Sequence, residues 1–345
     1  MGLDIGSSAV KAVELRRVSS GYRVVAMGSE PLPPDCIVDG AIIDGGVVSD
    51  VIRQLFDRNG IKTKEVVASL SGNAVIVKKI VLPLMSDDEL RESIYWEAEQ
   101  YIPFDIQDVN LDYQVLQADS GAESTGTMDV LLVAAKKEKI ADYTGVIAQA
   151  GRIPVVVDVD AFALQNVFEA NYGVGRVRVV VLINAGASAI NINIIEAGQS
   201  LFTRDISIGG NAYTEALQRD LNLSFEDADL LKRGVPAEGA SLEDADPIVQ
   251  TVTGNLLLEV EKTFDFFKST AGTERIDQLV VCGGAAGIEG FEPALATRFD
   301  LPVSHLDPFR QIELDSKKIT EERRQELAST AAVAVGLALR RADDR

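Results

Sequence analysis

Cysteine and histidine are nearly missing from this chain of 345 residues. The two cysteines, Cys36 and Cys282, are far apart and form no CxxC pair, which argues against a disulfide framework and a cysteine-based zinc site. His305 is the single histidine, so an HExxH motif is impossible and a Ser-His-Asp triad would have to use this residue. We expect His305 to have a structural role.

Long apolar runs are also absent, and positive charge is scarce. No stretch approaches the roughly eighteen uncharged apolar residues of a membrane-spanning helix, and no basic-then-apolar leader opens the sequence. The 53 acidic and 33 basic residues give a formal charge of −20, which repels nucleic acid and anionic lipid head groups. We therefore expect no nucleic-acid partner and no direct membrane insertion, and a reducing cytoplasm suits the few cysteines.

The common signatures of nucleotide binding are missing as well, but a repeat is present. Neither the P-loop sequence GxxxxGK[ST] nor an opening GxGxxG that leads into a helix occurs. Residues 2–28 instead predict three strands with a glycine in the first turn, and residues 177–205 repeat this plan. Asp4 and Asn184 occupy matching places 180 residues apart, so we predict two similarly built lobes with a cleft between them.

The first turn of each repeat has the residues of a phosphate loop. Gly6 permits a tight turn and, with Ser7 and Ser8, leaves backbone N–H groups open to phosphate oxygens. Lys11 can reach back over the turn as a point charge, and Asp4 can hold a hydrated Mg²⁺. An ordinary hairpin with a solvent-facing lysine is the alternative interpretation. The second copy of the turn favours phosphate binding.

Two further glycine clusters bear on the same cleft. Gly209 and Gly210 precede a helical pattern, whose N-terminus offers free N–H groups and a positive dipole end to a ligand. Gly283 and Gly284 follow an apolar strand, where a flat ring such as adenine can approach the backbone closely. A glycine-rich helix entry and a plain strand-to-turn junction are the alternatives.

The helical segment 255–272 carries one more candidate pair. Its spacing leaves Glu259 and Lys262 about one turn apart, where both can contact a single ligand. A solvated ion pair on the helix surface is the alternative, and the sequence does not choose between them.

A different pattern begins near Ser86, which can cap a helix with an acidic first turn that ends before Pro103. Trp96 projects away from the apolar stripe of this helix and either packs on a neighbouring subdomain or anchors a peptide partner. Two strands follow, with a mobile hairpin tip expected at residues 120–126, and such a subdomain suits strand pairing with an extended peptide. The stripe expected in the core consists of Leu90, Ile94, Ala98 and Tyr101.

These motifs occur in the order seen in the actin/Hsp70/sugar-kinase nucleotide fold: DIGSSAVK, LINAGASAINI, IGGNAYTEAL, EDADLLK, EVEKTFDFF and VCGGAAG. More narrowly, EAEQYIPFDIQDVNLDYQVL (97–116) and VDVDAFALQNVF (157–168) resemble the PilM family of type IV pilus assembly proteins. That family is itself similar to the division protein FtsA. The resemblance covers essentially the whole chain.

The resemblance implies a two-lobed actin-like α/β fold with a small α+β subdomain inserted in the first lobe. It implies a cytoplasmic protein that binds ATP and Mg²⁺, serves pilus assembly and twitching motility, and is held at the inner membrane by gripping the N-terminal cytoplasmic peptide of PilN. Other inner-membrane assembly proteins and motor ATPases of the pilus are further candidate partners. The implied units are a first lobe (1–85, with 156–176 and 318–345), an insert (86–155) and a second lobe (177–317, with a helical part at about 207–265).

Carried onto this sequence, the nucleotide site of the family has three parts, with Asp4 as its metal-binding carboxylate. The first phosphate loop is Asp4, Gly6, Ser7, Ser8 and Lys11, and the second is Asn184, Gly186, Ala187 and Ser188. The adenosine side is Gly209, Gly210, Glu259, Lys262, Gly283 and Gly284.

Asn184 departs from the wider superfamily, in which the second loop usually starts with Asp and is followed by Thr. Asparagine can hydrogen-bond a metal-bound water, but it lacks the charge to hold Mg²⁺ or to act as a general base. The sequence therefore predicts ATP binding more strongly than hydrolysis, and the catalytic residue stays open among Asp4, Asp158 and Asp160. A small-molecule kinase and an FtsA-like filament-forming ATPase are the alternative functions on this fold.

Overall fold

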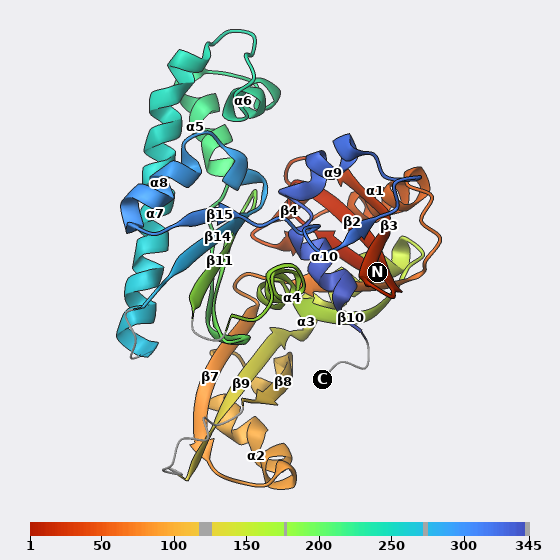
Figure 1. Ribbon diagram of the computed structural model, residues 1–345, viewed down its shortest axis with the longest axis vertical. Coiled ribbons are helices and arrows are strands. Elements are labelled where there is room, and N and C mark those ends of the chain that lie inside the picture. Colours follow the sequence, from red (N-terminus) through yellow and green to blue (C-terminus); the bar gives the residue numbers. More distant parts are fainter. Residues whose placement is uncertain (117–125, 176–177, 272–274, 342–345) are drawn as a thin grey trace.

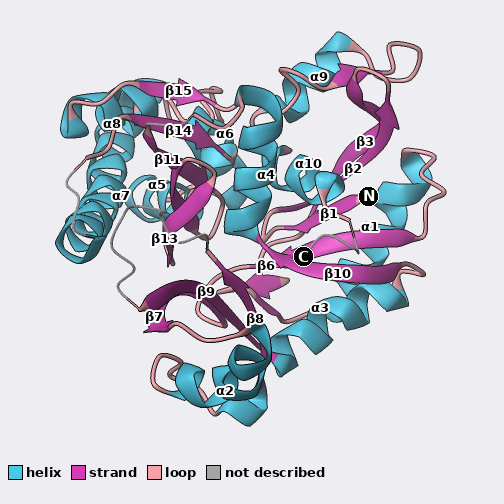
Figure 2. Cartoon of the chain, turned by 60° about the horizontal axis from the view of Figure 1, so that its bottom comes forward, coloured by secondary structure: helices cyan, strands magenta, loops and turns pink. Residues whose placement is uncertain are grey.

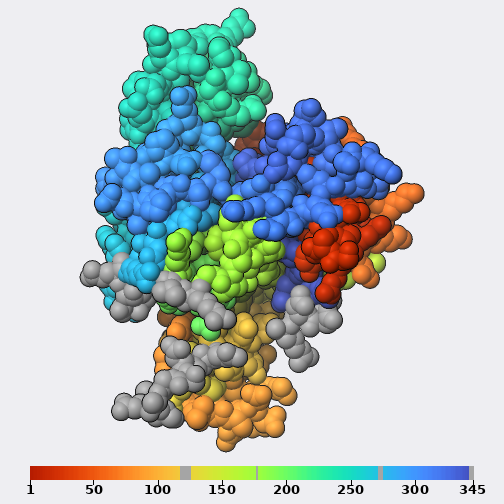
Figure 3. Space-filling view, viewed as in Figure 1, coloured from red at the N-terminus to blue at the C-terminus, as the bar shows by residue number. Residues whose placement is uncertain are grey.

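The computed structural model describes residues 1–116, 126–175, 178–271 and 275–341. Two lobes lie side by side, and a smaller third unit extends from one end of the molecule (Figure 1). Of the hairpin tip expected at 120–126, all but Gly126 lies outside the described residues. In the space-filling view, N-terminal and C-terminal segments lie against each other in the first lobe (Figure 3).

The first lobe is built on a six-stranded sheet in the order β10-β6-β1-β2-β3-β16. Strands β1 (Gly2–Ile5), β2 (Ala9–Val18) and β3 (Gly21–Pro31) form the antiparallel meander that the sequence predicts. Strands β6 (Glu65–Leu70) and β10 (Ile153–Val159) continue the sheet as parallel neighbours on the β1 side.

The second lobe repeats this arrangement in a five-stranded sheet of order β13-β12-β11-β14-β15. Strands β11 (Val179–Ala185), β12 (Ile190–Glu196) and β13 (Gln199–Ile206) form the second predicted meander. Strands β14 (Gln278–Cys282) and β15 (Val303–His305) are again parallel neighbours beside the first strand of the meander. The repeat seen in the sequence thus extends to five strands of each lobe.

The two lobes meet where helices α4 (Asp160–Tyr172) and α10 (Ala332–Leu339) pack on each other between the sheets (Figure 1). A Cβ atom on Gly336 would lie 1.9 Å from the Ala163 carbonyl oxygen, so only glycine allows this close crossing. Buried side chains of both sheets, such as Val67 and Leu182, share one apolar cluster with these helices. The lobes are therefore joined through a common core.

The third unit is a three-stranded antiparallel sheet of β7 (Val75–Pro83), β9 (Thr127–Lys136) and β8 (Val109–Val115), with helix α2 (Asp87–Glu99) packed on it. The predicted cap of α2 is confirmed, since Ser86 and Glu89 form a reciprocal capping box. The predicted stripe is buried at Leu90, Ile94 and Ala98 and partly buried at Tyr101.

Trp96 is 73% exposed on α2, so it does not pack closely on a neighbouring subdomain in the part of the chain that the structure describes. Its other predicted role, to anchor a peptide partner, stays a prediction.

The limits of the inserted unit also follow from pairing and packing. Strand β7 precedes Ser86 but pairs with β9 along its whole length. Helix α3 (Lys137–Gln149), by contrast, buries Tyr143 and Ile147 in the core of the first lobe. We therefore propose residues 75–136 as the inserted unit in place of 86–155.

The remaining elements cover the two large sheets. In the first lobe α1 and α3 lie side by side (Figure 2), and in the second α5, α6 and α7 form a helical cap (Figure 1).

No helix within the described ranges is both long and apolar enough to span a membrane. The bounds are β4 Ile37–Val38, β5 Ala41–Ile42, α1 Gly45–Arg58, α5 Asn211–Leu221, α6 Phe225–Lys232, α7 Leu242–Ala271, α8 Phe291–Phe299, β16 Glu313–Leu314 and α9 Glu321–Ala328, with 3₁₀ turns at Ile106–Asp108 and Gly284–Gly287.

Candidate functional site

The two predicted glycine turns face each other between the lobes. In each turn the glycine N–H donates to the carbonyl three residues later, at 3.1 Å from Gly6 and 2.9 Å from Gly186. Ser7 Oγ donates to Ser188 Oγ at 2.9 Å, which joins the turns directly. The sequence repeat therefore places its two loops in contact, although Ser8 is exposed.

Matching side-chain pairs lie behind the two turns. In the first lobe Lys11 Nζ lies 3.1 Å from Asp4 Oδ2, and both side chains are only 14% exposed. In the second lobe the residues at the same register are Asn184 and Asn191, whose side chains are joined by a 3.0 Å hydrogen bond. An ion pair in one lobe thus corresponds to an uncharged amide pair in the other.

Asp205 on β13 supplies the carboxylate that Asn184 lacks, and sequence reasoning did not identify it. Its Oδ1 accepts a 2.7 Å hydrogen bond from Asn191 Nδ2, so the chain of donors runs from Asn184 through Asn191 to Asp205. Its Oδ2 accepts a hydrogen bond from the Gly72 backbone N–H of the first lobe. The signal in the sequence was the polar Asn191, which alternates with isoleucines in a largely buried strand.

Asp160 is the first residue of α4, and its carboxylate lies among the loop residues. Ser69 Oγ donates to Asp160 Oδ1, and Ser71 also hydrogen-bonds this carboxylate. Burial, followed by the negative charge of Asp4, raises the pKa of Asp160 to about 7, against the lowering effect of the serines. Asp205 adds to the increase. Asp160 therefore shares one electrostatic environment with carboxylates from both lobes.

Asp158 lies apart from this group. Its carboxylate is 3.2 Å from Arg340 Nε at the end of α10, and its side chain is only 8% exposed. Burial is the main cause that raises its pKa, and Asp112 on β8 of the inserted unit adds to the increase. Asp158 lies near the end of β10 and is paired with Arg340, whereas Asp160 begins α4 and is hydrogen-bonded to Ser69, so the two carboxylates have different surroundings and Asp160 is the one associated with the cleft.

The other glycine clusters pack against the second turn. The Gly210 N–H donates to Gly186 O at 2.9 Å, and the next N–H along α5 donates to Ala187 O at 2.7 Å. A Cβ on Gly209 would lie 2.6 Å from Gly186 O, and one on Gly283 would lie 2.6 Å from Asn184 Oδ1. Gly284 then begins the 3₁₀ turn that follows Gly283. These close approaches require glycine and bring both clusters to the loop.

Glu259 and Lys262 do not join this group. Lys262 Nζ lies 2.6 Å from Glu259 Oε1, and the two side chains are 64% and 36% exposed. Among the described residues, neither is hydrogen-bonded to the glycine turns. The structure thus has the surface ion pair that was the alternative interpretation, and their predicted contact with adenosine stays a prediction.

The charge in the cleft determines which ligands can enter it. Asp4 and Asp205 both lie close enough to influence Asp160, and Lys11 is paired with Asp4. A bare phosphate anion would be repelled, whereas an anion that carries a divalent cation fits this charge distribution. In the part of the chain that the structure describes, no three Asp, Glu, His or Cys side chains form a metal cage. Mg²⁺, which keeps waters and needs few carboxylates, suits such a site.

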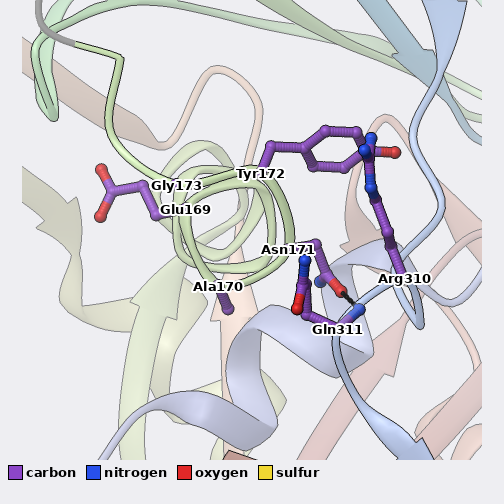
Figure 4. Close-up of a pocket in the computed structure, with 7 residues that line it drawn as sticks. All are labelled: Glu169, Ala170, Asn171, Tyr172, Gly173, Arg310 and Gln311. Carbon is purple, nitrogen blue, oxygen red and sulfur yellow. Dashed lines mark hydrogen bonds between the residues drawn. The ribbon is translucent and has the colours of Figure 1, made fainter.

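A pocket of about 360 Å³ lies at the C-terminal end of α4, opposite the end that carries Asp160 (Figure 4). The Arg310 guanidinium lies 4.8 Å from the centre of the Tyr172 ring. Asn171 donates to the Pro308 carbonyl and accepts the Gln311 N–H, so its amide serves the local fold. The lining residues share none of the cleft side chains, and we assign no ligand to this pocket.

A duplicated meander with two parallel strands, helices that cross between the lobes, and facing glycine turns define an actin-like protein. The comparisons with known proteins make the assignment narrower. The chain belongs to the family described as type IV pilus assembly protein PilM, because the sequence model of this family matches residues 2–342. The predicted fold class and the predicted family are both confirmed.

Solved structures agree with this assignment. A PilM-PilN type IV pilus biogenesis complex contains a chain 28% identical to this one, with a TM-score of 0.88 over 100% of this chain and 98% of the other. Ethanolamine utilization protein EutJ from Carboxydothermus hydrogenoformans is 14% identical, with a TM-score of 0.57 over 98% and 88% of the chains. MreB5 of Spiroplasma citri bound to ADP is 14% identical, with a TM-score of 0.52 over 97% and 93%. The last two share the fold alone.

Proposed function

We propose that this protein is an ATP-binding scaffold of type IV pilus assembly that grips the N-terminal cytoplasmic peptide of PilN and is thereby held at the inner membrane. The observation that carries the proposal is the full-length similarity, at a TM-score of 0.88, to the chain in a PilM-PilN complex. Similarity over the whole length covers both the cleft and the inserted unit. Both ligands are therefore expected to bind.

The cleft is the proposed site of ATP with Mg²⁺. The turn amides near Gly6 and Gly186 would hold phosphate oxygens, Lys11 would add a positive charge, and Asp4 would bind the metal through water. The metal would neutralise phosphate charge that the three carboxylates otherwise repel. MreB5, with the same fold, is a protein solved with ADP.

Binding rather than turnover is the proposed role of the nucleotide. Asn184 is uncharged and its amide is engaged with Asn191, so the second turn offers no general base. Asp160 is the carboxylate of α4 near the loops, and slow hydrolysis would depend on it. A small-molecule kinase or a filament-forming ATPase is not favoured.

The PilN peptide is proposed to dock as an added strand at the junction of the first lobe and the inserted unit. Strands β8 and β10 are the outer strands of their sheets. They lie near each other, since Asp112 of β8 influences Asp158 of β10. Ile153 and Val155 on β10 are 52% and 40% exposed. An extended peptide could use the open backbone groups for affinity and the apolar side chains for specificity.

Arg340 adds a polar anchor at the same junction. Its Nε is buried and donates no hydrogen bond among the described residues, although Asp158 lies 3.2 Å away. A buried donor without an acceptor is unfavourable by about 1–3 kcal/mol. A carbonyl of an incoming peptide would satisfy it.

Calorimetric titration with Mg-ATP and with a synthetic PilN N-terminal peptide tests both halves of the proposal. We expect Val155→Asp to weaken peptide binding at least tenfold and to leave nucleotide binding unchanged. Val235→Asp, at a valine of similar exposure in the second lobe, is the matched control and should change neither. Equal peptide affinity in Val155→Asp and Val235→Asp would refute docking of the peptide on β10. A wild-type protein that binds neither ligand would refute the proposed function.

A further inference from the structure

Asp205 occupies an unusual position, because its two carboxylate oxygens face different lobes. Oδ1 accepts from Asn191 Nδ2 of its own lobe at 2.7 Å. Oδ2 accepts from the Gly72 backbone N–H of the first lobe at 2.5 Å. A carboxylate that accepts a backbone N–H forms a charge-assisted hydrogen bond, which is stronger than one between neutral groups.

The first-lobe partner of Asp205 connects the cleft to the inserted unit. Gly72 lies between β6, which ends at Leu70, and β7, which begins at Val75. Ser69 near the end of β6 and Ser71 just after it hydrogen-bond Asp160 in the cleft. Gly72 itself has a φ of 82°, a conformation that favours glycine. The segment 69–72 thus contacts the second lobe through Gly72 and the cleft carboxylate through Ser69 and Ser71.

The inserted unit touches the second lobe at the same place. Strand β7, which starts three residues after Gly72, packs beside β13, the strand that carries Asp205. Strand β7 also pairs with β9, and β9 pairs with β8. A shift of the 69–72 segment would therefore be transmitted through the three-stranded sheet to its outer strand.

We propose that Asp205 is a positioning residue that couples occupation of the cleft to the placement of the inserted unit, and through it to peptide binding. This inference rests on the proposed function, since it needs a nucleotide and a peptide. Asp205 and Asp160 repel each other across the cleft, and Asp160 is also repelled by Asp4. A cation-bearing nucleotide reduces this repulsion and so strengthens the closed arrangement in which Asp205 holds the Gly72 N–H.

The coupling must be reciprocal: if nucleotide tightens peptide binding by some factor, the peptide tightens nucleotide binding by the same factor. We expect a factor of at least about five in the wild-type protein, the lower end of typical coupling between sites. Asp205→Asn keeps the size of the side chain and removes its charge. The factor should fall below about two in this variant, because a neutral amide responds little to a cation in the cleft.

The test is a pair of calorimetric titrations on the full chain: the synthetic PilN peptide with and without saturating Mg-ATP, and Mg-ATP with and without the peptide. Asp265→Asn, on an exposed position of α7, is the matched control that removes the same charge elsewhere. Asp205→Glu keeps the charge and should retain most of the coupling. Hydrogen exchange at the Gly72 amide gives a second readout, which should be at least tenfold faster in Asp205→Asn than in the wild type.

The outcomes separate this inference from the proposed function. The inference is supported if Asp205→Asn loses the coupling and exchanges the Gly72 amide faster, while Asp265→Asn and Asp205→Glu keep the coupling. Two ligands that bind the wild type independently, or full coupling in Asp205→Asn, would overturn it and leave the proposed function standing. If the wild type fails to bind one of the ligands, the proposed function itself fails. A melting curve shows whether Asp205→Asn is folded. If it is not, Asp205→Glu decides the question. Coupling at the wild-type level in Asp205→Glu then supports the inference, and loss of coupling with unchanged exchange at the Gly72 amide contradicts it.

Discussion

The crossing of α4 and α10 gives a sharp prediction, since it joins the two lobes. A Cβ on Gly336 would lie 1.9 Å from the Ala163 carbonyl oxygen, a contact that real Cβ atoms do not make. The oxygen belongs to the backbone of α4, so the helices must separate by more than an ångström to admit the methyl group. Overpacking of this kind is unfavourable by about 1–3 kcal/mol, occasionally more. We expect Gly336→Ala to be near the upper end.

Gly254 in the middle of α7 is the matched control, because a Cβ there would meet no atom within 4 Å. Replacing a helical glycine by alanine should stabilise the protein by about 1 kcal/mol where space allows. The same gain applies to Gly336→Ala and offsets part of its strain, which leaves a net loss of about 2 kcal/mol or more. The two variants share one chemical change and are predicted to have effects of opposite sign.

Thermal unfolding followed by circular dichroism measures both. For a chain of this length, 1 kcal/mol corresponds to about 1.5 °C in apparent melting temperature. We expect Gly336→Ala to lower it by about 3 °C or more and Gly254→Ala to raise it by about 1.5 °C. A Gly336→Ala protein that melts at or above the wild-type temperature would show that α4 and α10 do not cross this closely.

Three further predictions concern the cleft and α2. Asn184→Asp breaks the donor chain to Asn191 and places two acceptors in contact, so the free energy of unfolding should fall by about 1–3 kcal/mol in denaturant titrations; an unchanged midpoint would contradict the assigned direction of the chain. The pKa of Asp160 is raised from 3.8 to about 7, so the folded state binds this proton more tightly than the unfolded chain does. Its contribution to stability is complete below about pH 4 and is lost as the pH rises through about 7. The free energy of unfolding should therefore decline less between these pH values in Asp160→Asn than in the wild type. An equal decline in the two proteins would count against the shifted pKa. Ser86→Ala removes the capping box of α2 and should destabilise the inserted unit by about 1 kcal/mol. Hydrogen exchange should therefore be faster than in the wild type in α2 and unchanged in α5.

The parts of the fold that the sequence predicts are those where local chemistry decides the structure. Alternating side chains and a glycine turn define the meander at residues 2–28, because period-two alternation fits a strand and glycine fits the tight turn. The cap at Ser86 is equally local, since three residues suffice to form it. The serine contact between the two turns followed from the repeat, which places equivalent loops in equivalent positions.

The parts that were missed depend on contacts between distant segments. Asp205 looks like any polar residue of an outer strand until the first lobe brings the Gly72 N–H against it. The spacing of Glu259 and Lys262 fits a ligand pair and a surface ion pair equally well; the structure shows the ion pair, and the contact with adenosine stays a prediction. Strand β7 falls within the predicted first lobe (1–85), whereas its pairing partner β9 comes more than forty residues later in the chain.

The central claim is that the two glycine turns bind a triphosphate with its metal, and calorimetric titration of Mg-ATP into the wild type and Lys11→Ala tests it most directly. Lys62→Ala, at an exposed lysine outside the cleft, is the control. The account predicts that the affinity of Lys11→Ala falls at least tenfold, about 1.4 kcal/mol or more, while Lys62→Ala matches the wild type. Equal affinities for all three proteins, or no nucleotide binding by the wild type, would contradict it.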